Sequence, residues 1–157
     1  MFGAILQPMS KNDRAIARLS GIREMLAEHG LGLRPQHLCV GPATIQFGRE
    51  SLRSIFERPE PQPTAIICGN DTLAVGAFLE SRKLGLRVPD DLSITGFDDI
   101  EIAGELDPPL TTMKVDNVEI GRLAALQLIS RMRGESPSLK IPIQPIFLER
   151  GTTSRPR

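Results

Sequence analysis

The stretch that decides the fold is residues 63–99, PTAIICGNDTLAVGAFLESRKLGLRVPDDLSITGFDD. Its β-branched run at 64–68 predicts a short strand. A helical pattern follows over 71–84 and ends at Gly85, a residue well suited to the position after a helix. A second apolar run at 92–97 predicts another strand. An apolar strand, a helix and a second apolar strand in this order predict neighbouring strands of a parallel sheet.

The same alternation continues toward both ends of the chain. One helix is expected between SKND at 10–13, where Ser10 or Asn12 can cap it, and Gly30, which follows its last turn. Further strands are predicted at 2–7 and 37–40, extended segments at 110–115 and 141–148, and helices at 47–57, 99–104 and 117–133. The sequence therefore predicts an α/β fold, an open parallel sheet with helices on both faces.

The bulk composition limits the classes of protein that the chain could belong to. Its 157 residues suit one domain, or one and a fraction. Lys and Arg together number 19, as do Asp and Glu, so the chain lacks the basic excess typical of a free-standing DNA-binding domain. The arginine-rich tail, with Arg150, Arg155 and Arg157, is interpreted as a frayed C-terminus.

The cysteines, histidines and apolar runs indicate no metal site, cofactor or membrane span. Cys39 and Cys68 are far apart in sequence and sit in apolar runs, so we expect two buried thiols. His29 and His37 complete no ligand spacing. The chain has no apolar run of the length that a membrane span needs, and its first residues do not resemble a signal peptide. We therefore expect a cytoplasmic protein.

Polar turns follow three of the predicted strands. They are Gly41-Pro42-Ala43-Thr44, Gly69-Asn70-Asp71 and Gly96-Phe97-Asp98-Asp99. In an open parallel sheet, ligands bind outside the carboxyl ends of the strands, so these turns should face one edge. Arg18, in the second turn of the first predicted helix, leans toward the same edge.

Helix capping is the alternative interpretation of the acidic turns. Asn70 or Asp71 could cap the helix that follows, because a helix N-terminus needs a hydrogen-bond acceptor. Asp98 or Asp99 could do the same for the short turn at 99–104. Capping by Asn70 or Asp71 does not exclude a contact with a ligand.

Arg18 also has a simpler interpretation, as a surface residue that pairs with Asp13 or Glu24. If it does reach the edge, its guanidinium and a carboxylate there would suit adjacent hydroxyls of a ligand, because one donates several hydrogen bonds and the other accepts several. Such a site favours polyols or nucleosides over phosphates, which prefer a glycine-rich loop with a lysine or a helix N-terminus free of acids.

Several segments, in this order and spacing, resemble the effector domain of LacI/GalR-family transcription regulators. NDRAIARLSGIREML at 12–26 is similar to the Arg-x-x-Gly helix of that family, and FLERGTTSRP at 147–156 is similar to its last strand and tail. The central segments are CGNDTLAVGA at 68–77, GLRVPDDLSITGFDD at 85–99, PPLTTMKVD at 108–116 and EIGRLAALQL at 119–128.

The resemblance implies a periplasmic-binding-protein-like fold of type I, with two α/β subdomains around a cleft. Residues 1–115 would form the C-terminal effector subdomain, and 136–157 would be its return strand and tail. The helix within 116–135 would belong to the N-terminal subdomain, which precedes this stretch in the family together with the DNA-binding head. Without that subdomain, the helix should expose an apolar stripe, and such stripes promote association. The stripe consists of Ile120, Leu123, Ala124 and Leu128.

The resemblance also implies a set of effector contacts. Members of the family often have an aromatic residue that stacks on the ligand where this chain has Ala43, and a polar residue where it has Val115. Because this chain lacks both residues, the family's usual ligand contacts do not identify its effector. The implied effector-binding positions are Arg18, Asn70, Asp71, Asp98, Ala43 and Val115.

By the same resemblance, two subunits would pair through the third helix and the segment after GFDD. The matching apolar positions are Val75, Leu79 and Leu106. Val75 has an alternative role, since an amphipathic helix must turn some apolar side chains toward its sheet. We expect a homodimer.

The sequence thus predicts the effector-sensing domain of a LacI-type DNA-binding regulator, which binds a small sugar-like or nucleoside ligand between subdomains and controls operator binding. One alternative is a sugar-binding protein of a transport system with the same fold. Another is an Mg²⁺-dependent phosphoryl-transfer enzyme that uses Asp71, Asp98 and Asp99. Such an enzyme would typically need an acidic pair after the first strand, where this chain has Gln7-Pro8-Met9. We expect no enzyme activity and no cofactor.

Overall fold

Four strands form one parallel sheet in the order β2-β1-β3-β4, which confirms the predicted open parallel sheet. The computed structural model describes residues 1–59, 61–135 and 141–155. Register places Ile5 opposite both Cys39 and Cys68 in the two neighbouring strands. The strands are β1 (Phe2–Leu6), β2 (Leu33–Val40), β3 (Ala65–Cys68) and β4 (Ser93–Thr95).

The helices begin and end close to the predicted signals. Asn12, Thr44 and Asn70 each cap a helix by accepting a hydrogen bond from the backbone N–H three positions later. Gly30 and Gly85 follow α1 and α3 with φ of +67° and +73°, a left-handed conformation that glycine adopts readily. The helices are α1 (Asp13–Glu28), α2 (Ile45–Phe56), α3 (Asp71–Lys83) and α4 (Glu101–Glu105).

Strand β2 is longer than predicted. Its expected range was 37–40, but pairing with β1 begins at Leu33, which lies opposite Phe2. Pro35 weakens the sequence signal because proline cannot donate a ladder hydrogen bond. An edge strand tolerates proline, and β2 is an edge of this sheet.

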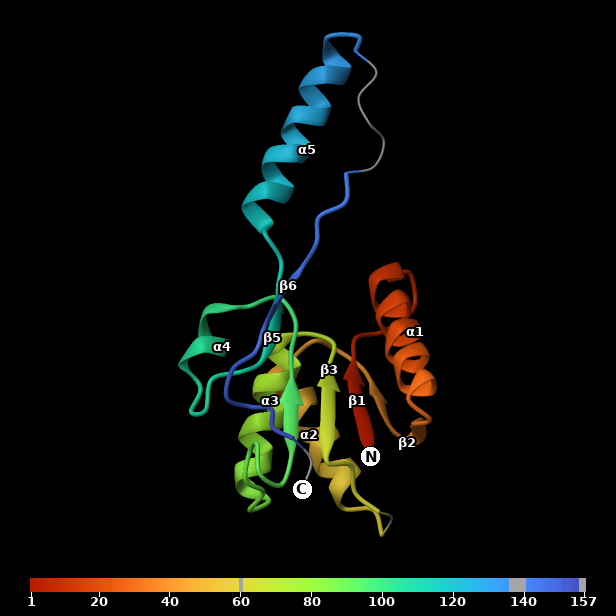
Figure 1. Ribbon diagram of the computed structural model, residues 1–157, viewed down its shortest axis with the longest axis vertical. Coiled ribbons are helices and arrows are strands. Elements are labelled where there is room, and N and C mark those ends of the chain that lie inside the picture. Colours follow the sequence, from red (N-terminus) through yellow and green to blue (C-terminus); the bar gives the residue numbers. More distant parts are fainter. Residues whose placement is uncertain (60, 136–140, 156–157) are drawn as a thin grey trace.

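Different helices bury the two faces of the sheet (Figure 1). Ile5 belongs to the main hydrophobic cluster, with apolar side chains of α2 and α3. Its neighbours Ala4 and Leu6 are just as buried but lie outside that cluster. Since side chains alternate along a strand, they point to the opposite face, which α1 covers with its buried residues Ala15 and Leu26.

Helix α5 projects away from the sheet, as Figure 1 shows. No residue of α5 is buried. Of the four side chains expected to be uncovered, Ile120, Ala124 and Leu128 are exposed, whereas Leu123 is half-buried and lines a groove with Ile141. The segment that leads to α5 and the one that returns from it pair as a short antiparallel ribbon, not as part of the main sheet. The elements are β5 (Thr112–Lys114), α5 (Asn117–Met132) and β6 (Ile146–Leu148).

The two cysteines are free thiols, Cys68 buried and Cys39 half-buried. Burial raises the pKa of both thiols. In the part of the chain that the structure describes, no helix has the length and apolar character needed to cross a membrane.

Helices α2 and α3 pack closely around a buried acid. The backbones touch at Gly48 and Gly76, where an added Cβ would collide with the facing helix. Nearby, the Glu80 side chain is only 2% exposed and accepts hydrogen bonds from Arg49 Nε at 3.0 Å and Arg53 Nε at 2.8 Å. The hydrogen bonds from Arg53 lower the pKa of Glu80 below its ordinary value of 4.5, burial of the carboxylate opposes this fall, and the hydrogen bond from Arg49 adds to it.

We predict that Glu80→Gln destabilises the chain by about 1–2 kcal/mol at pH 7, because the charge-assisted hydrogen bonds are lost. Glu80 has a lowered pKa in the folded state, so its contribution is present above its unfolded pKa and is lost as the pH falls through the folded pKa. Urea unfolding at pH 7 and pH 3.5 should therefore show a difference between wild type and variant that shrinks at the lower pH.

Glu28→Gln, at an exposed position of α1, is the matched control and should leave the free energy of unfolding unchanged. A deficit of equal size at both pH values for Glu80→Gln would show that the ion pairs are not its cause.

Candidate functional site

The predicted turns do meet at the carboxyl edge of the sheet. The backbone N–H of Asp71 donates to the carbonyl oxygen of Phe97 at 2.8 Å, which joins the turns after β3 and β4. Arg18 reaches the same edge from α1, and its Nη1 donates to the carbonyl oxygen of Gly69 at 2.6 Å. The turn at 41–44 follows β2 in the same parallel sheet, and so lies at this edge as well.

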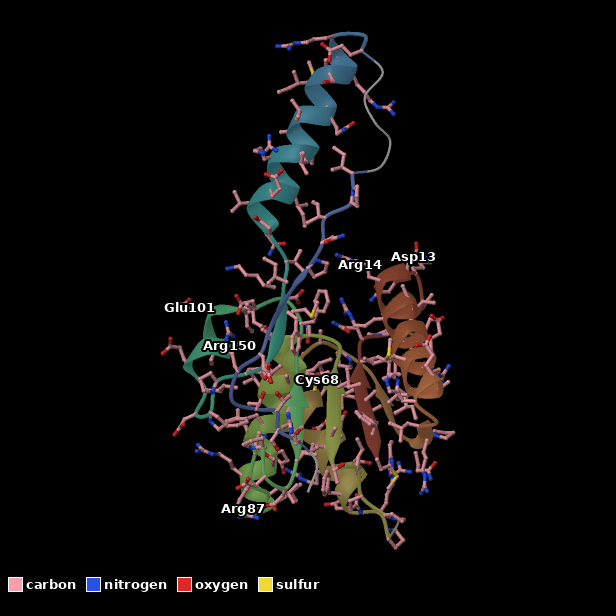
Figure 2. The ribbon with its side chains drawn as sticks, viewed as in Figure 1. Asp13, Arg14, Cys68, Arg87, Glu101 and Arg150 are labelled. Carbon is pink, nitrogen blue, oxygen red and sulfur yellow. The ribbon has the colours of Figure 1, made fainter. Side chains whose placement is uncertain are left out.

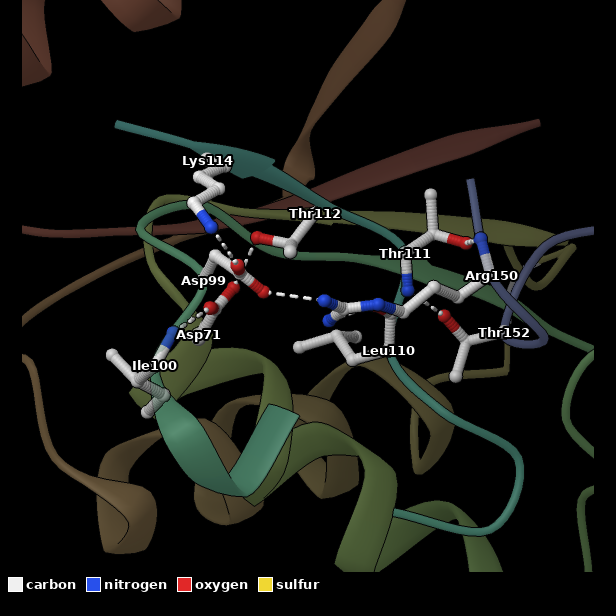
Figure 3. A network of polar contacts seen from close by, with 9 residues as sticks. All are labelled: Asp71, Asp99, Ile100, Leu110, Thr111, Thr112, Lys114, Arg150 and Thr152. Atoms are coloured by element: carbon white, nitrogen blue, oxygen red, sulfur yellow. Dashed lines mark hydrogen bonds and ion pairs between the residues drawn. The ribbon is translucent and has the colours of Figure 1, made fainter. Parts of the chain in front are cut away.

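Asp71 is turned into the fold, where its side chain has no exposed surface (Figure 3). Its Oδ1 accepts a hydrogen bond from the Thr112 hydroxyl at 2.6 Å, and its Oδ2 accepts one from the Ile100 backbone N–H at 3.0 Å. A side chain at Gly96 would collide with the same carboxylate. Asp71 therefore joins α3 to β5 and to the turn that follows β4. Its carboxylate has no surface open to a ligand.

The capping alternative is confirmed for Asn70 alone. Its Oδ1 accepts from the Leu73 backbone N–H at 3.0 Å and so caps α3. Within the described residues, the amide nitrogen of Asn70 makes no hydrogen bond, and the residue is half-buried. The capping interpretation is wrong for Asp98 and Asp99, because the N-cap of α4 is Ile100, which has no side-chain cap.

Arg18 lies flat against an aromatic ring. Its guanidinium carbon is 3.9 Å from the centroid of Phe97, a cation–π contact that orients the side chain. The alternative of a surface pair with Asp13 or Glu24 is wrong, since Glu24 instead accepts a hydrogen bond from Ser20 at 2.7 Å. The helix brings Arg18 to the edge of the sheet because it packs across β1 and β2 (Figure 1).

Asp98 presents an open carboxylate opposite Arg18. Its backbone has φ of +112° and its N–H donates to the carbonyl oxygen of Met113 at 2.9 Å, so the main chain is held in place. No side chain among the described residues forms a hydrogen bond or ion pair with this carboxylate. Partial burial raises the pKa of Asp98, and the charge of Arg18 opposes that rise. Burial also lowers the pKa of Arg18, and the charge of Asp98 opposes that fall.

The neighbouring Asp99 is engaged entirely within the protein (Figure 3). Its Oδ1 pairs with Arg150 Nη2 at 2.6 Å, and its Oδ2 lies 3.8 Å from Lys114 Nζ. Arg150 Nη1 donates further to the carbonyl oxygen of Leu110 at 3.2 Å. The two adjacent aspartates thus have different roles. Asp98 has an open carboxylate, whereas Asp99 holds β5 and the segment after β6, which flank α5.

The expectation of a frayed C-terminal tail is wrong for its first part. Arg150 is held by Asp99, and Thr152 is fully buried. The Ile94 backbone N–H donates to the Thr152 carbonyl at 2.9 Å, and the Thr152 hydroxyl donates to the Ile94 carbonyl at 2.7 Å. The tail pairs with β4 because that edge strand has backbone groups left to satisfy. Arg155 is exposed, and Arg157 lies outside the described residues.

The remaining predicted positions have mixed surroundings. Ala43 is exposed at its turn, and Val115 is half-buried after β5. Among the residues expected at a dimer interface, Leu79 is 39% exposed, and Leu106 is partly buried against the core. Val75 is only 2% exposed, so the alternative role in the helix core holds for it.

Two residues at this edge were absent from the predicted set. Phe97 supports Arg18, and its position inside the GFDD turn was the available signal. Arg14 acts electrostatically on both Arg18 and Asp98. Its spacing of four residues before Arg18, which places both on one face of a helix, was the signal in that case.

Residues 1–153 match the sequence profile of the periplasmic binding protein-like domain. The HTH-type transcriptional repressor CytR of Escherichia coli (strain K12) is 40% identical over 118 residues, which are 75% of this chain and 34% of that protein. The ribose operon repressor of the same strain is 33% identical over 151 residues, which are 94% of this chain and 44% of that protein. The chain thus spans about a third to under a half of the length of these relatives.

Solved structures agree with the sequence comparison. A regulatory protein of the LacI family from Chloroflexus aggregans superposes with a TM-score of 0.89 at 30% identity, over 98% of this chain and 55% of that one. The parallel sheet, the match over almost the whole chain and this likeness are consistent with one another. The chain belongs to the periplasmic binding protein-like domain family, and within it corresponds to part of the effector domain of LacI/GalR-type regulators.

Proposed function

We propose that this chain is the effector-sensing part of a cytoplasmic, LacI-type transcriptional repressor that has no catalytic activity. It binds a small, hydroxyl-rich ligand at the carboxyl edge of its sheet, and the bound ligand changes the affinity of the intact protein for its operator. The names of two relatives, an HTH-type transcriptional repressor and a ribose operon repressor, support the regulatory role.

The observation that carries the proposal is the pairing of an oriented guanidinium with an open carboxylate. Arg18 is held by Phe97 and by the Gly69 carbonyl, which leaves its other N–H groups available. Asp98 opposite accepts hydrogen bonds and donates none while ionised. A vicinal diol supplies donors for Asp98 and acceptors for Arg18, so a sugar or nucleoside satisfies both. We place Asn70 at the side of this site through its free amide nitrogen, with Ala43 and Val115 at its rim, and assign Asp71 a structural role.

We infer that helix α5 joins a second subdomain that covers the ligand from the opposite side. Its uncovered apolar side chains, such as Val118 at 83% and Leu128 at 62% exposed, support this arrangement, because apolar surfaces of this extent usually contact another protein surface. A ligand held between two subdomains can act on DNA binding only if it binds one arrangement of them better than the other. In this scheme DNA is contacted by a part of the protein outside these residues.

We further propose a homodimer through the outer surface of α3 and α4. Leu79 and Ile102 are 39% and 46% exposed there, and Leu106 lies between this surface and the core. Val75 is buried in the core beneath this surface and supports it by packing.

A thermal-shift screen of sugars and nucleosides should identify a stabilising ligand. Arg18→Ala and Asp98→Asn should each weaken its affinity tenfold or more, because a hydrogen bond to a charged group contributes about 1.5–3 kcal/mol. Isothermal titration calorimetry of each variant checks this. Glu24→Gln, on the exposed part of α1, is the control and should bind as wild type does. Full affinity in both site variants would refute the assignment of the site.

Sedimentation velocity tests the dimer. Leu79→Asp should reduce the wild-type mass to that of a monomer, because a charge in an apolar interface loses its hydration. Leu128→Asp is the matched control, because Leu128 is an exposed apolar residue of α5 that lies outside the proposed dimer surface. Loss of the dimer in Leu128→Asp and not in Leu79→Asp would show that the apolar side chains of α5 cause the association. The same mass for wild type and Leu79→Asp would contradict the proposed interface.

A further inference from the structure

We propose that the effector carries an anionic group, a carboxylate or a phosphate, and that Arg14 binds this group at the rim of the site formed by Arg18, Phe97 and Asp98. This inference rests on the proposed function and narrows its ligand class from hydroxyl-rich molecules in general to hydroxylated acids or phosphate esters. It departs from the sequence-based preference for neutral polyols or nucleosides, which considered Arg18 without Arg14.

Arg14 lies one helical turn before Arg18, on the same face of α1. Arg18 is already engaged by the Gly69 carbonyl and the Phe97 ring. Arg14 is exposed, and none of the described residues forms a hydrogen bond or an ion pair with its guanidinium. In Figure 2 it leaves α1 near the end of the helix that lies at the carboxyl edge of the sheet. Arg14 therefore offers a complete set of free donors next to the proposed ligand.

The acidic residues near Arg14 form no ion pair with it among the described residues. Asp13, the preceding residue of α1, projects from a different side of the helix, because consecutive helical residues do not face each other. Asp99 is taken up by Arg150 and Lys114, at 2.6 and 3.8 Å. Asp71 has no exposed surface, and its two oxygens accept hydrogen bonds within the fold. Of Asp71, Asp98 and Asp99, only Asp98 remains open toward the ligand.

The open part of the site therefore has two positive charges, Arg14 and Arg18, and one negative charge, Asp98. The charge of Arg14 acts on both Arg18 and Asp98, which supports the assignment of the three side chains to one site. Burial lowers the pKa of Arg18, Asp98 opposes the change, and Arg14 reinforces it. Burial raises the pKa of Asp98, and both Arg18 and Arg14 oppose that rise.

Two guanidinium groups at this spacing on a helix repel each other. An anionic group of the ligand next to Arg14 would remove that repulsion and complete the charge balance of the site. A planar guanidinium matches the oxygens of a carboxylate or phosphate with paired hydrogen bonds. The hydroxyls of the same ligand would meet Asp98. A hydroxylated acid or a phosphate ester satisfies both ends, whereas a neutral sugar leaves Arg14 without a partner.

The test compares ligands that share a carbon skeleton and differ in charge: ribose, ribonate and ribose 5-phosphate, and glucose, gluconate and glucose 6-phosphate. Each is titrated calorimetrically into the chain at matched ionic strength. In at least one series, the acid or the phosphate ester should bind tenfold or more tightly than the neutral sugar. Whether the acid or the ester binds more tightly distinguishes a carboxylate ligand from a phosphate ligand.

Arg14→Gln should abolish this preference, whereas Arg23→Gln, at an exposed position further along α1, should retain it. The inference is overturned if wild type shows no preference for a charged ligand in either series, including the case in which none binds, or if the preference survives in Arg14→Gln. A neutral ligand whose binding depends on Arg18 and Asp98 but not on Arg14 would overturn this inference and leave the proposed function standing.

Discussion

At the carboxyl edge of the sheet, the buried carboxylate of Asp71 joins three segments that are far apart in the chain. The carboxylate accepts hydrogen bonds from Ile100 in the turn after β4 and from Thr112 in β5. The backbone N–H of Asp71 donates to the carbonyl oxygen of Phe97 in the same turn. A buried carboxylate is costly unless its oxygens are satisfied, so these three segments must stay together. The position of Phe97, on which the Arg18 guanidinium lies, depends on the backbone of this same residue, Asp71.

The GFDD turn, residues 96–99, connects this fixed edge to the proposed ligand site and to the strands that flank α5. Asp98 and Asp99 both have positive φ, at +112° and +56°, a conformation that costs non-glycine residues about 1–3 kcal/mol. The surrounding hydrogen bonds and the ion pair between Asp99 and Arg150 hold it in place. The backbone of Asp98 is thus held in place, and in the proposed function a fixed backbone would reduce the entropy lost on binding. The adjacent Asp99 forms ion pairs with Lys114 in β5 and with Arg150 after β6.

The polar groups of this edge are those that the proposed sensing function requires. The described edge combines one oriented donor group, Arg18, one open acceptor, Asp98, and a second arginine, Arg14, that forms no ion pair with a described residue. Recognition of a hydroxylated ligand needs only complementary donors and acceptors in a shaped site. Strands β5 and β6 connect this edge to α5, so in the proposed function they would link ligand binding to the second subdomain.

Features of the protein that depend on local sequence were predictable from the chain alone. Periodicity, the caps at Asn12 and Asn70, and the glycines after α1 and α3 determine where elements begin and end, because each acts over a few residues. The parallel order of the strands then brings the turns to one edge. The tertiary structure alone decided which aspartate is buried, which is open and which is paired. It placed Arg150 on Asp99 and Arg18 on Gly69, each across 51 residues of sequence. Contacts of that range depend on how the whole chain packs, and neither periodicity nor spacing carries that information.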